Sequence, residues 1–411
     1  MEVNKAALQR AIAAFGAVWL IGTGLVFGLR SLASDAAPDQ PEPTGPTSPT
    51  TEPSLTPEAY VAWVPGGFPP GFAEGLERSR SVADISIASA DNVWMVRSFN
   101  QAGRVEDDPR GGSMIPIDAT GVDPVTFAPF LPEDSVALVR GLDSDEGILS
   151  RTSARLRGVG IGGQLEFQEG VVVRVGAVLA DELMGGYELL VTRSTGEQIG
   201  IDTDRYAIFR VSGDEPPAVK DLQREFRGLI PGGSTFGVVQ VRAPGQTRFL
   251  RMSDLIQPPA LLKREFGEFA ARPSSIDGSL DIEGRWVRKN IVRETVPLLG
   301  RIQCHRKLIP LVRSAMAEVR SEGLSDLVRT YSGCYAPRTT LGVPGASISH
   351  HAWGAAIDIN APDQPFGEEP TPRQTRLAEI MERWGFIWGG RFIVPDPHHF
   401  EWFGPPEEPE A

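Results

Sequence analysis

The hydrophobic pattern of the chain begins with one long apolar run near the N-terminus. Residues 11–29 carry no charge, and Arg10 and Arg30 bound them. A helix rises about 1.5 Å per residue, so this run would extend roughly 28 Å, close to the hydrocarbon thickness of a bilayer. In lipid, a single segment satisfies its own backbone polar groups only as a helix. The pattern therefore predicts a transmembrane helix, and the basic residues before it favour a cytoplasmic N-terminus.

A cleaved signal peptide is the alternative for the same segment, because Ser31-Leu32-Ala33 resembles a small-x-small cleavage site. Both interpretations place the rest of the chain outside the cytoplasm. We therefore expect a single-pass protein of the cell membrane with extracytoplasmic C-terminal domains, or a secreted protein if the segment is cleaved. Residues 1–33 are assigned to a cytoplasmic tip and this membrane anchor.

Residues 34–57 have no apolar periodicity and are rich in Pro, Thr, Ser and acidic residues. Such a composition favours an extended, polyproline-like chain without a packed core. We expect a linker here, either a spacer that lifts a domain away from the membrane or disordered filler.

Residues 58–270 contain short runs of β-branched and aromatic residues, separated by turns that contain Gly and Pro. The spacing of these runs predicts a β-rich domain, built as a sandwich or a barrel. The region has no His, no Cys and no Gly-rich phosphate loop. Its role, as a binding or positioning module or as a structural spacer, stays open. The clearest runs are 171–175, 187–192, 206–211 and 236–241.

Helical periodicity replaces this pattern in the last third of the chain. Apolar residues recur at three- and four-residue spacing from Leu308 to Val319, and Gly323 follows as a stop. Residues 372–384 predict a second helix, with a proline at its start and Gly385 just past its end. Residues 327–331 are typical of a strand. These elements predict a small α+β domain over residues 271–405, followed by an acidic tail, 406–411.

Composition and charge narrow the functional classes. A length of 411 residues with 41% hydrophobic residues is enough for two folded units with cores of their own. The formal net charge of −13 excludes a nucleic-acid partner, because phosphate binding needs a basic face and the chain has no Arg/Lys-rich run.

The candidate chemistry lies in two histidine pairs. The chain has five histidines, and four of them form the pairs His350-His351 and His398-His399, each near an aspartate. Catalytic zinc is held by three protein ligands, commonly imidazole and carboxylate, and keeps one open position. A further carboxylate must stand nearby to take a proton from water. Two histidines, Asp358 and Asp396 meet these requirements.

The order and spacing of these residues resemble the D-alanyl-D-alanine carboxypeptidase family of zinc peptidases, the VanY-type group. The resemblance covers about residues 272–405. It implies one zinc ion bound by His351, Asp358 and His399, with Asp396 as general base. It also implies that Arg338, upstream, holds the peptide or its carboxylate; a surface arginine after a turn proline is the alternative. The motif reads Ser349-x-His351-x-x-Gly354-x-Ala356-x-Asp358, then Asp396-x-x-His399-Phe400-Glu401.

The neighbours of these residues have less specific roles. Ser349 and Glu401 fit a role in orienting the ligands through hydrogen bonds, and for Glu401 a structural ion pair is an equal alternative. The spacing selects His351 and His399 as ligands, so we expect His350 and His398 to line the cleft or face solvent.

Cys304 and Cys334 are the only cysteines, and both lie in the predicted peptidase domain. Their 30-residue separation, the absence of a CxxC motif and the expected extracytoplasmic location favour a disulfide. Two buried free thiols are the alternative.

The predicted fold class is α+β: a small zinc-peptidase domain with a central antiparallel sheet, preceded by a β-rich domain and an N-terminal transmembrane helix. The predicted function is hydrolysis of peptidoglycan stem peptides at the cell envelope. A D,D-carboxypeptidase and a related L-Ala–D-Glu-type endopeptidase are not separated by the sequence. The rival hypothesis is a membrane-anchored envelope scaffold or peptidoglycan-binding protein that retains the metal site.

Overall fold

This computed structural model describes residues 58–213, 215–232, 234, 237–246, 249, 251 and 256–406. All of them belong to one compact unit, Pro53–Ala411. The predicted anchor, residues 11–29, and the predicted linker, residues 34–57, lie outside the described residues.

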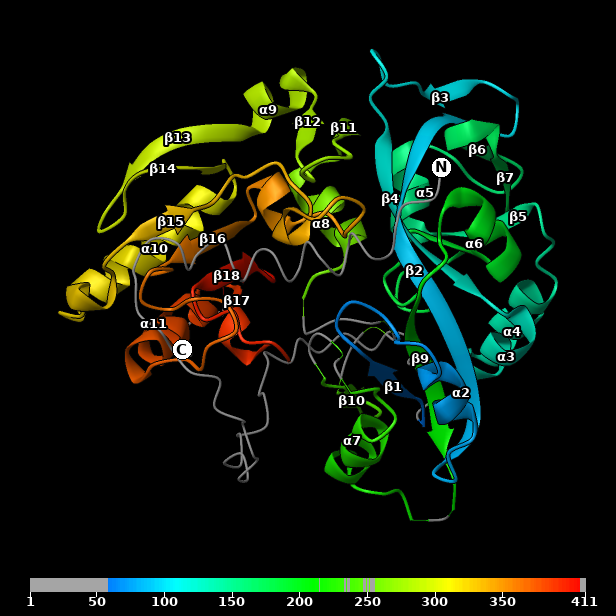
Figure 1. The fold of residues 1–411 in the computed structure, drawn as a ribbon. Coiled ribbons are helices and arrows are strands. Elements are labelled where there is room, and N and C mark those ends of the chain that lie inside the picture. The colour runs from blue at the N-terminus through cyan, green and yellow to red at the C-terminus, as the bar shows by residue number, and fades with distance from the viewer. Residues whose placement is uncertain are drawn as a thin grey trace. The chain divides into compact units, whose positions relative to one another are not determined.

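The first part of the described chain is built on a single mixed sheet that closes on itself. Its strands follow the order β10-β1-β9-β2-β4-β8-β5-β7-β6, and an additional pairing of β6 with β2 closes the last six. The 18-residue strand β2 makes this closure possible, because it pairs with β9, then β4, then β6 along its length (Figure 1). The strands are β1 (Tyr60–Trp63), β2 (Val82–Phe99), β3 (Val105–Asp107), β4 (Ile115–Val122), β5 (Glu146–Ser150), β6 (Gln164–Phe167), β7 (Val172–Leu179), β8 (Leu189–Thr192), β9 (Asp204–Val211) and β10 (Gln240–Arg242).

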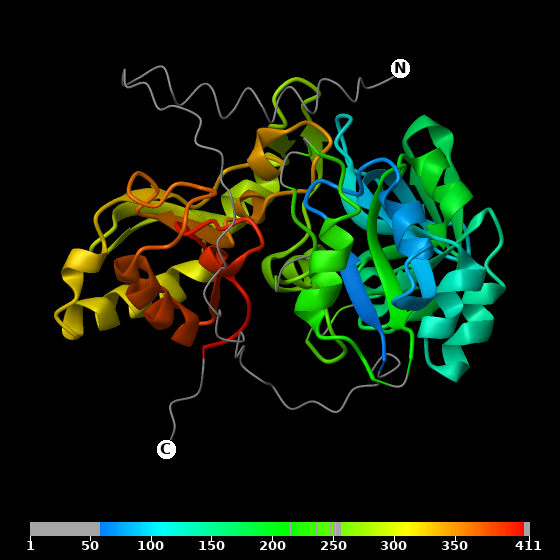
Figure 2. The same ribbon diagram turned by 60° about the horizontal axis from the view of Figure 1, so that its bottom comes forward.

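Short helices flank these strands, as Figure 2 shows from a second side. Their ends follow from local chemistry. Ser150 caps the start of α5, because its side chain accepts from the Ser153 N–H, and Thr192 caps the start of α6 in the same way. Glycines in the left-handed region end both helices, Gly158 with φ 61° and Gly200 with φ 99°. The helices are α2 (Phe72–Glu77), α3 (Pro124–Phe127), α4 (Glu133–Arg140), α5 (Arg151–Arg157), α6 (Arg193–Ile199) and α7 (Val219–Arg227).

The predicted fold class is wrong for the chain as a whole. The pairs β4–β8 and β5–β7 are parallel, so the expected β-rich domain is a mixed, closed sheet with interleaved helices. Parallel neighbours need a crossover connection, and here the crossovers contain short helices. These helices are too short to show a strong 3.6-residue period, so the strand signal dominated the sequence pattern.

The second part of the described chain carries a four-stranded antiparallel sheet in the order β15-β16-β18-β17. Helices α10 and α11 contact each other and share one core with this sheet. The elements are α8 (Pro259–Phe266), β11 (Ala271–Pro273), β12 (Leu280–Ile282), α9 (Gly284–Asn290), β13 (Ile291–Val296), β14 (Gly300–His305), α10 (Leu308–Ser321), β15 (Tyr331–Gly333), β16 (Ala356–Ile359), α11 (Pro372–Arg383), β17 (Phe386–Trp388) and β18 (His399–Trp402).

The two predicted helices of this part are present as α10 and α11. The predicted strand at 327–331 is displaced, because Ser325–Leu327 forms a short 3₁₀ helix and β15 starts only at Tyr331. The predicted disulfide between Cys304 and Cys334 is present, with their Cα atoms 5.4 Å apart.

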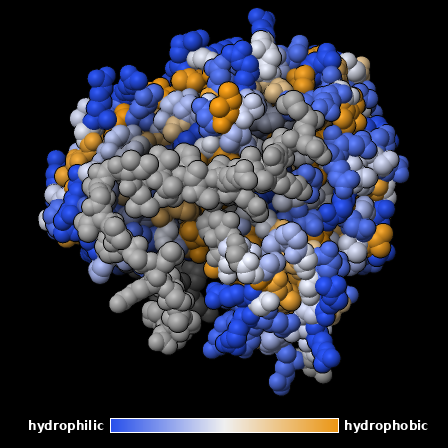
Figure 3. Space-filling view, viewed as in Figure 1, coloured by the Kyte–Doolittle hydropathy of each residue, from blue (hydrophilic) through white to orange (hydrophobic). Residues whose placement is uncertain are grey.

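The predicted single-pass membrane localisation has no support in the described part of the chain. Across residues 58–406, apart from the positions named above, no helix is both long and apolar enough to cross a bilayer. The face seen in Figure 3 is largely hydrophilic, with apolar residues scattered over it.

A cluster of buried charges lies among α5, α8 and the residues before β8. Nζ of Lys263 is 3.0 and 2.8 Å from the two carboxylate oxygens of Glu188, and Arg157 Nη2 is 2.9 Å from Glu188 Oε1. Both cations also contact Glu268, at 3.0 Å from Lys263 and 2.6 Å from Arg157. The side chains of Arg157 and Glu188 are 0% exposed, so the charges stabilise one another instead of being hydrated.

Candidate metal centre

A single 3₁₀ turn, η5 (His350–Trp353), presents His351. Ser349 caps this turn, because its side-chain oxygen accepts from the His351 N–H at 3.3 Å. The turn ends at Gly354, with φ 65°. A Cβ at this position would lie 2.6 Å from the backbone nitrogen of His305, so only glycine fits. The Ser349 side chain thus positions the turn by accepting from the turn's backbone.

Asp358 and His399 come from neighbouring strands. They are directly paired across β16 and β18, so their side chains leave the same face of the sheet. Ile357 and Ile359 flank Asp358, point to the opposite face and are fully buried. The alternation of β16 therefore turns the carboxylate away from the core.

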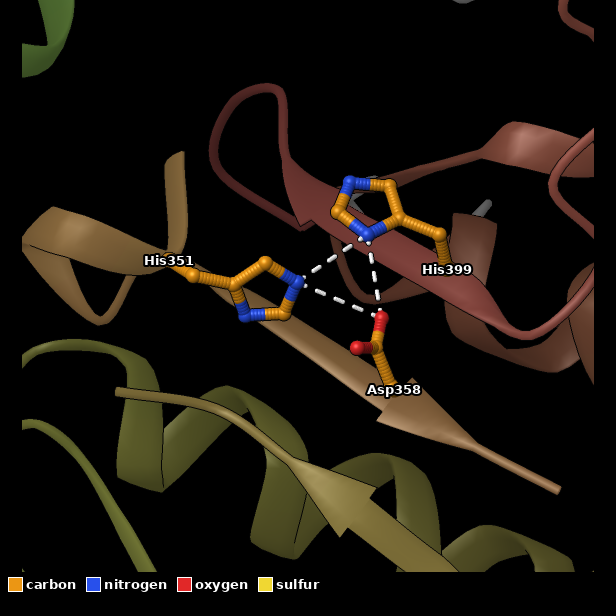
Figure 4. Close-up of side chains that lie close together, drawn as sticks. All are labelled: His351, Asp358 and His399. Carbon is orange, nitrogen blue, oxygen red and sulfur yellow. Dashed lines mark hydrogen bonds and ion pairs between the residues drawn. The ribbon is translucent and has the colours of Figure 1, made fainter. Parts of the chain in front are cut away.

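Three ligand atoms converge at this point (Figure 4). Nε2 of His351 lies 3.2 Å from Nδ1 of His399 and 3.3 Å from Oδ1 of Asp358. His399 Nδ1 is 3.0 Å from the same carboxylate oxygen. Among the described residues, this is the group of His, Cys, Asp and Glu side chains that could hold a metal ion.

Hydrogen bonds on the far side of each ring fix which nitrogen faces the cluster. His351 Nδ1 lies 2.7 Å from the Cys334 carbonyl oxygen, which can only accept, so Nδ1 carries the proton. His399 Nε2 lies 3.1 Å from Oε2 of Glu401 and donates to it. The lone pairs of His351 Nε2 and His399 Nδ1 are thereby directed at each other and at Asp358.

This donor set fits zinc. Tetrahedral zinc with ligand bonds of about 2.0–2.2 Å keeps its ligands about 3.3–3.6 Å apart, so the cluster need open only slightly. Three acceptor atoms this close repel one another unless a cation or a proton lies among them. Two imidazoles and one carboxylate are also the ligand types that zinc takes in catalytic sites.

The electrostatics of the cluster follow from burial and close pairing. Burial opposes the charge of Asp358, but His351 and His399 hold the pKa of its carboxyl well below the ordinary value. Burial also opposes charge on His399, yet the neighbouring carboxylates of Asp358 and Glu401 raise the pKa of its imidazole. The site therefore has a strong preference for positive charge at its centre.

Asp396 stands in the turn that leads into β18. Its backbone N–H donates to the Gly389 carbonyl oxygen at 2.8 Å, and its own carbonyl oxygen accepts from the His399 N–H at 3.0 Å. A Cβ on Gly389 would lie 2.6 Å from the Asp396 carbonyl oxygen, so this close approach requires glycine. Burial raises the pKa of Asp396, against the opposing effect of His399 and His398. A carboxylate with a raised pKa suits a group that accepts and returns a proton.

The two remaining histidines of the pairs both lie beside a carboxylate. His350 is buried, with Nδ1 2.8 Å from Glu401 Oε2, so it neither lines an open cleft nor faces solvent as expected. His398 donates through Nδ1 to the Gln364 carbonyl at 2.6 Å and places Nε2 3.1 Å from Oδ1 of Asp396.

Arg338 is not brought to the ligands. Its guanidinium approaches the Thr339 carbonyl oxygen at 3.5 Å, and its own carbonyl accepts from the Ser349 N–H. In the described structure no hydrogen bond or ion pair joins its side chain to the cluster. Its role in holding the substrate stays a prediction.

Two polar residues that the sequence interpretation missed hold the backbone on both sides of the site. Gln374, in α11, donates through Nε2 to the carbonyls of Ile359, at 3.1 Å, and Pro397, at 2.9 Å. Asn360 donates to Gln374 Oε1 at 2.9 Å. Both amides are buried. The signal that could have found Gln374 is a polar residue on the apolar face of a helix, three and four residues before Leu377 and Ala378.

The disulfide holds the backbone next to His351. Cys334 follows β15, and its carbonyl oxygen is the acceptor that orients His351. Cys304, in β14, anchors that segment covalently. The bridge thus fixes the backbone group that sets the tautomer of one candidate ligand.

Comparison with known protein families finds a match in the part of the chain that carries the candidate ligands. Residues 344–402 match the family described as D-alanyl-D-alanine carboxypeptidase. The matched segment contains the three candidate ligands, Asp396 and Glu401, and it leaves out Arg338 and both cysteines. A peptidase-family segment is therefore present at the C-terminal end of the chain only. No curated protein matches the chain.

Two solved structures show a weaker likeness. The periplasmic region of MacB from Actinobacillus actinomycetemcomitans is 12% identical, with 46% of this chain and 90% of that one covered and a TM-score of 0.30. The extracellular domain of the noncanonic ABC-type transporter YknZ from Gram-positive bacteria is 13% identical, with 45% and 99% covered and a TM-score of 0.29. Likenesses at this level establish no shared function.

Proposed function

We propose that the chain is a zinc-dependent peptidase of the VanY type that hydrolyses peptidoglycan stem peptides, as a D,D-carboxypeptidase or a related endopeptidase. The observation that carries the proposal is the convergence of His351 Nε2, Asp358 Oδ1 and His399 Nδ1 within hydrogen-bond distance of one another. The family match over residues 344–402 supports the same reaction class.

The division of work among the residues follows from their positions. A zinc ion held by His351, Asp358 and His399 would polarise the scissile carbonyl and lower the pKa of a water molecule. Asp396 accepts the proton of the attacking water and returns it to the leaving amine. The turn between Gly389 and His399 holds the Asp396 backbone beside β18, three residues before the candidate ligand His399, and this position supports the role.

The test uses the purified full chain, its metal content and its action on synthetic stem peptides. We expect about one zinc per chain and hydrolysis, with the product masses identifying the bond that is cut. His351→Ala should lose zinc and hydrolysis together. Asp396→Asn should keep zinc and lose about 10²–10⁴-fold in kcat, the range for a general acid–base group.

Two results would contradict the proposal. A chain without zinc affinity would remove the assignment of the three ligands. Zinc binding without hydrolysis of any stem peptide would instead favour an envelope scaffold that retains a metal site. Loss of folding in Asp396→Asn, seen by circular dichroism, would contradict its role as base.

A further inference from the structure

Each histidine pair divides into one histidine in the ligand cluster and one histidine beside a carboxylate. In the pair 350–351, His351 belongs to the cluster and His350 approaches Glu401 at 2.8 Å. In the pair 398–399, His399 belongs to the cluster and His398 approaches Asp396 at 3.1 Å. The two carboxylates differ in what they touch next.

Glu401 contacts a candidate ligand. The oxygen that His350 approaches, Oε2, is the same oxygen that accepts from His399 Nε2; His350 Nδ1 lies at ion-pair distance from it, without the geometry of a hydrogen bond. His399 and Glu401 are two residues apart in β18 and therefore lie on one face of the strand. The contacts form one chain, from His350 through Glu401 to His399 and the metal position.

Local structure explains why His350 can reach Glu401 while His351 reaches the ligands. In a 3₁₀ turn, successive residues are rotated by about 120° around the axis. His351 therefore faces the Cys334 carbonyl and the cluster, and His350 faces β18. His350 is 8% exposed and Glu401 is 4% exposed, so water does not replace either partner readily.

We propose that His350 is a positioning residue for the metal site, acting through Glu401 on His399. It holds the Glu401 carboxylate where that carboxylate accepts from His399 Nε2, so that Nδ1 of His399 keeps its lone pair for the metal. This inference rests on the zinc site of the proposed function. Removing a group that orients a metal-bound imidazole typically costs about 10–100-fold in metal affinity.

A packing role for His350 is the competing explanation, because its ring also lies 6.5 Å from that of Trp353. Two substitutions separate the explanations. His350→Leu fills a similar volume and removes the ring nitrogen that lies 2.8 Å from Glu401 Oε2. His350→Asn is smaller but keeps an N–H donor close to the position of Nδ1.

The experiment measures the zinc dissociation constant of the purified full chain by chelator competition. We expect His350→Leu to weaken zinc binding about 10–100-fold and His350→Asn to recover most of that loss. Glu401→Gln should also weaken binding. The double variant His350→Leu/Glu401→Gln should have the same zinc affinity as the single variant with the lower affinity, because both changes break one chain of contacts.

His398→Leu is the matched control. It removes the corresponding histidine of the other pair, whose neighbours are Gln364 and Asp396 and not a candidate ligand. Its zinc affinity should equal that of the wild type, whatever its turnover. Circular dichroism of the zinc-free variants shows whether each remains folded.

The outcomes are distinguishable. If His350→Leu binds zinc as tightly as the wild type, or His350→Asn as weakly as His350→Leu, the positioning role is refuted. If affinities change as expected but no stem peptide is hydrolysed, the positioning role stands and the proposed peptidase activity fails. If the wild type binds no zinc, both fail.

Discussion

At the scale of single residues, the site depends on buried amides as much as on its candidate ligands. One Gln374 amide group bonds the residue after Asp358 and the residue after Asp396. It is 0% exposed, and its carbonyl accepts from Asn360. A buried polar group that loses its partner costs about 1–3 kcal/mol. Gln374 therefore links α11 to both halves of the site.

We predict that Gln374→Leu lowers the free energy of unfolding by about 2–4 kcal/mol, because Asn360 Nδ2 and the Ile359 carbonyl lose a buried partner. Urea unfolding measures this change. Arg376→Gln is the control on the same helix, since Arg376 is exposed and its loss should change stability by less than about 0.5 kcal/mol. Equal stability of the two variants would refute the role of Gln374.

At this scale, the spacing of the motif residues determined which candidate ligands the sequence could predict. The motif spacing predicted which histidine of each pair belongs with Asp358, and the structure brings these three side chains together. Spacing carries no information about the tautomers, because the acceptor for His351 is the backbone carbonyl of Cys334, far away in sequence. It also could not place His350 on the buried side of the turn.

At the scale of elements, the approach of β14 to α10 is held by a neutral histidine. His305 Nε2 donates to the Phe266 carbonyl at 3.0 Å, and its Nδ1 accepts from the Lys307 N–H at 3.1 Å, just before α10 begins. Burial lowers the pKa of His305 to about 4, and Lys307 and Arg306 act in the same direction. Protonation of Nδ1 would remove the acceptor for Lys307.

The sign of the pH effect follows from this pKa. The folded pKa, about 4, lies below the ordinary value of 6.5, so the unfolded chain binds the extra proton first. Stability from this group is complete above pH 6.5 and is lost as the pH falls towards 4. The loss is on the order of 1–3 kcal/mol. Urea unfolding at pH 7.5 and pH 4.5 should show a smaller pH difference for His305→Gln than for the wild type; an identical difference would contradict this account.

Elements were predictable where their pattern is local. The apolar spacing of α10 and the proline and glycine at the ends of α11 lie within one segment each. The closed sheet is different. Its parallel strands β4 and β8 are about seventy residues apart in sequence, and they pair over only four residues. No local pattern specifies such a partner.

At the scale of the whole molecule, charged side chains from α5, α8 and the residues before β8 are buried against one another in the folded chain. The Lys263 and Glu188 side chains are 1% and 0% exposed. Burial opposes the charge of Glu188, yet Lys263 and Arg157 lower the pKa of its carboxyl. Removing one partner of a buried pair leaves an uncompensated charge and typically costs about 3–5 kcal/mol.

We predict that Lys263→Met destabilises the chain by about 3–5 kcal/mol, measured by urea unfolding. Because the cost arises from the stranded carboxylate, Lys263→Met/Glu188→Gln should recover part of the loss. Lys307→Met is the matched control: Lys307 pairs with Glu265 at 2.7 Å, but the two side chains are 52% and 40% exposed. An exposed ion pair contributes about 0–1 kcal/mol to stability. The loss in free energy of unfolding should therefore be several times larger for Lys263→Met than for Lys307→Met. If they destabilise the chain equally, burial is not what makes the Lys263 contact strong.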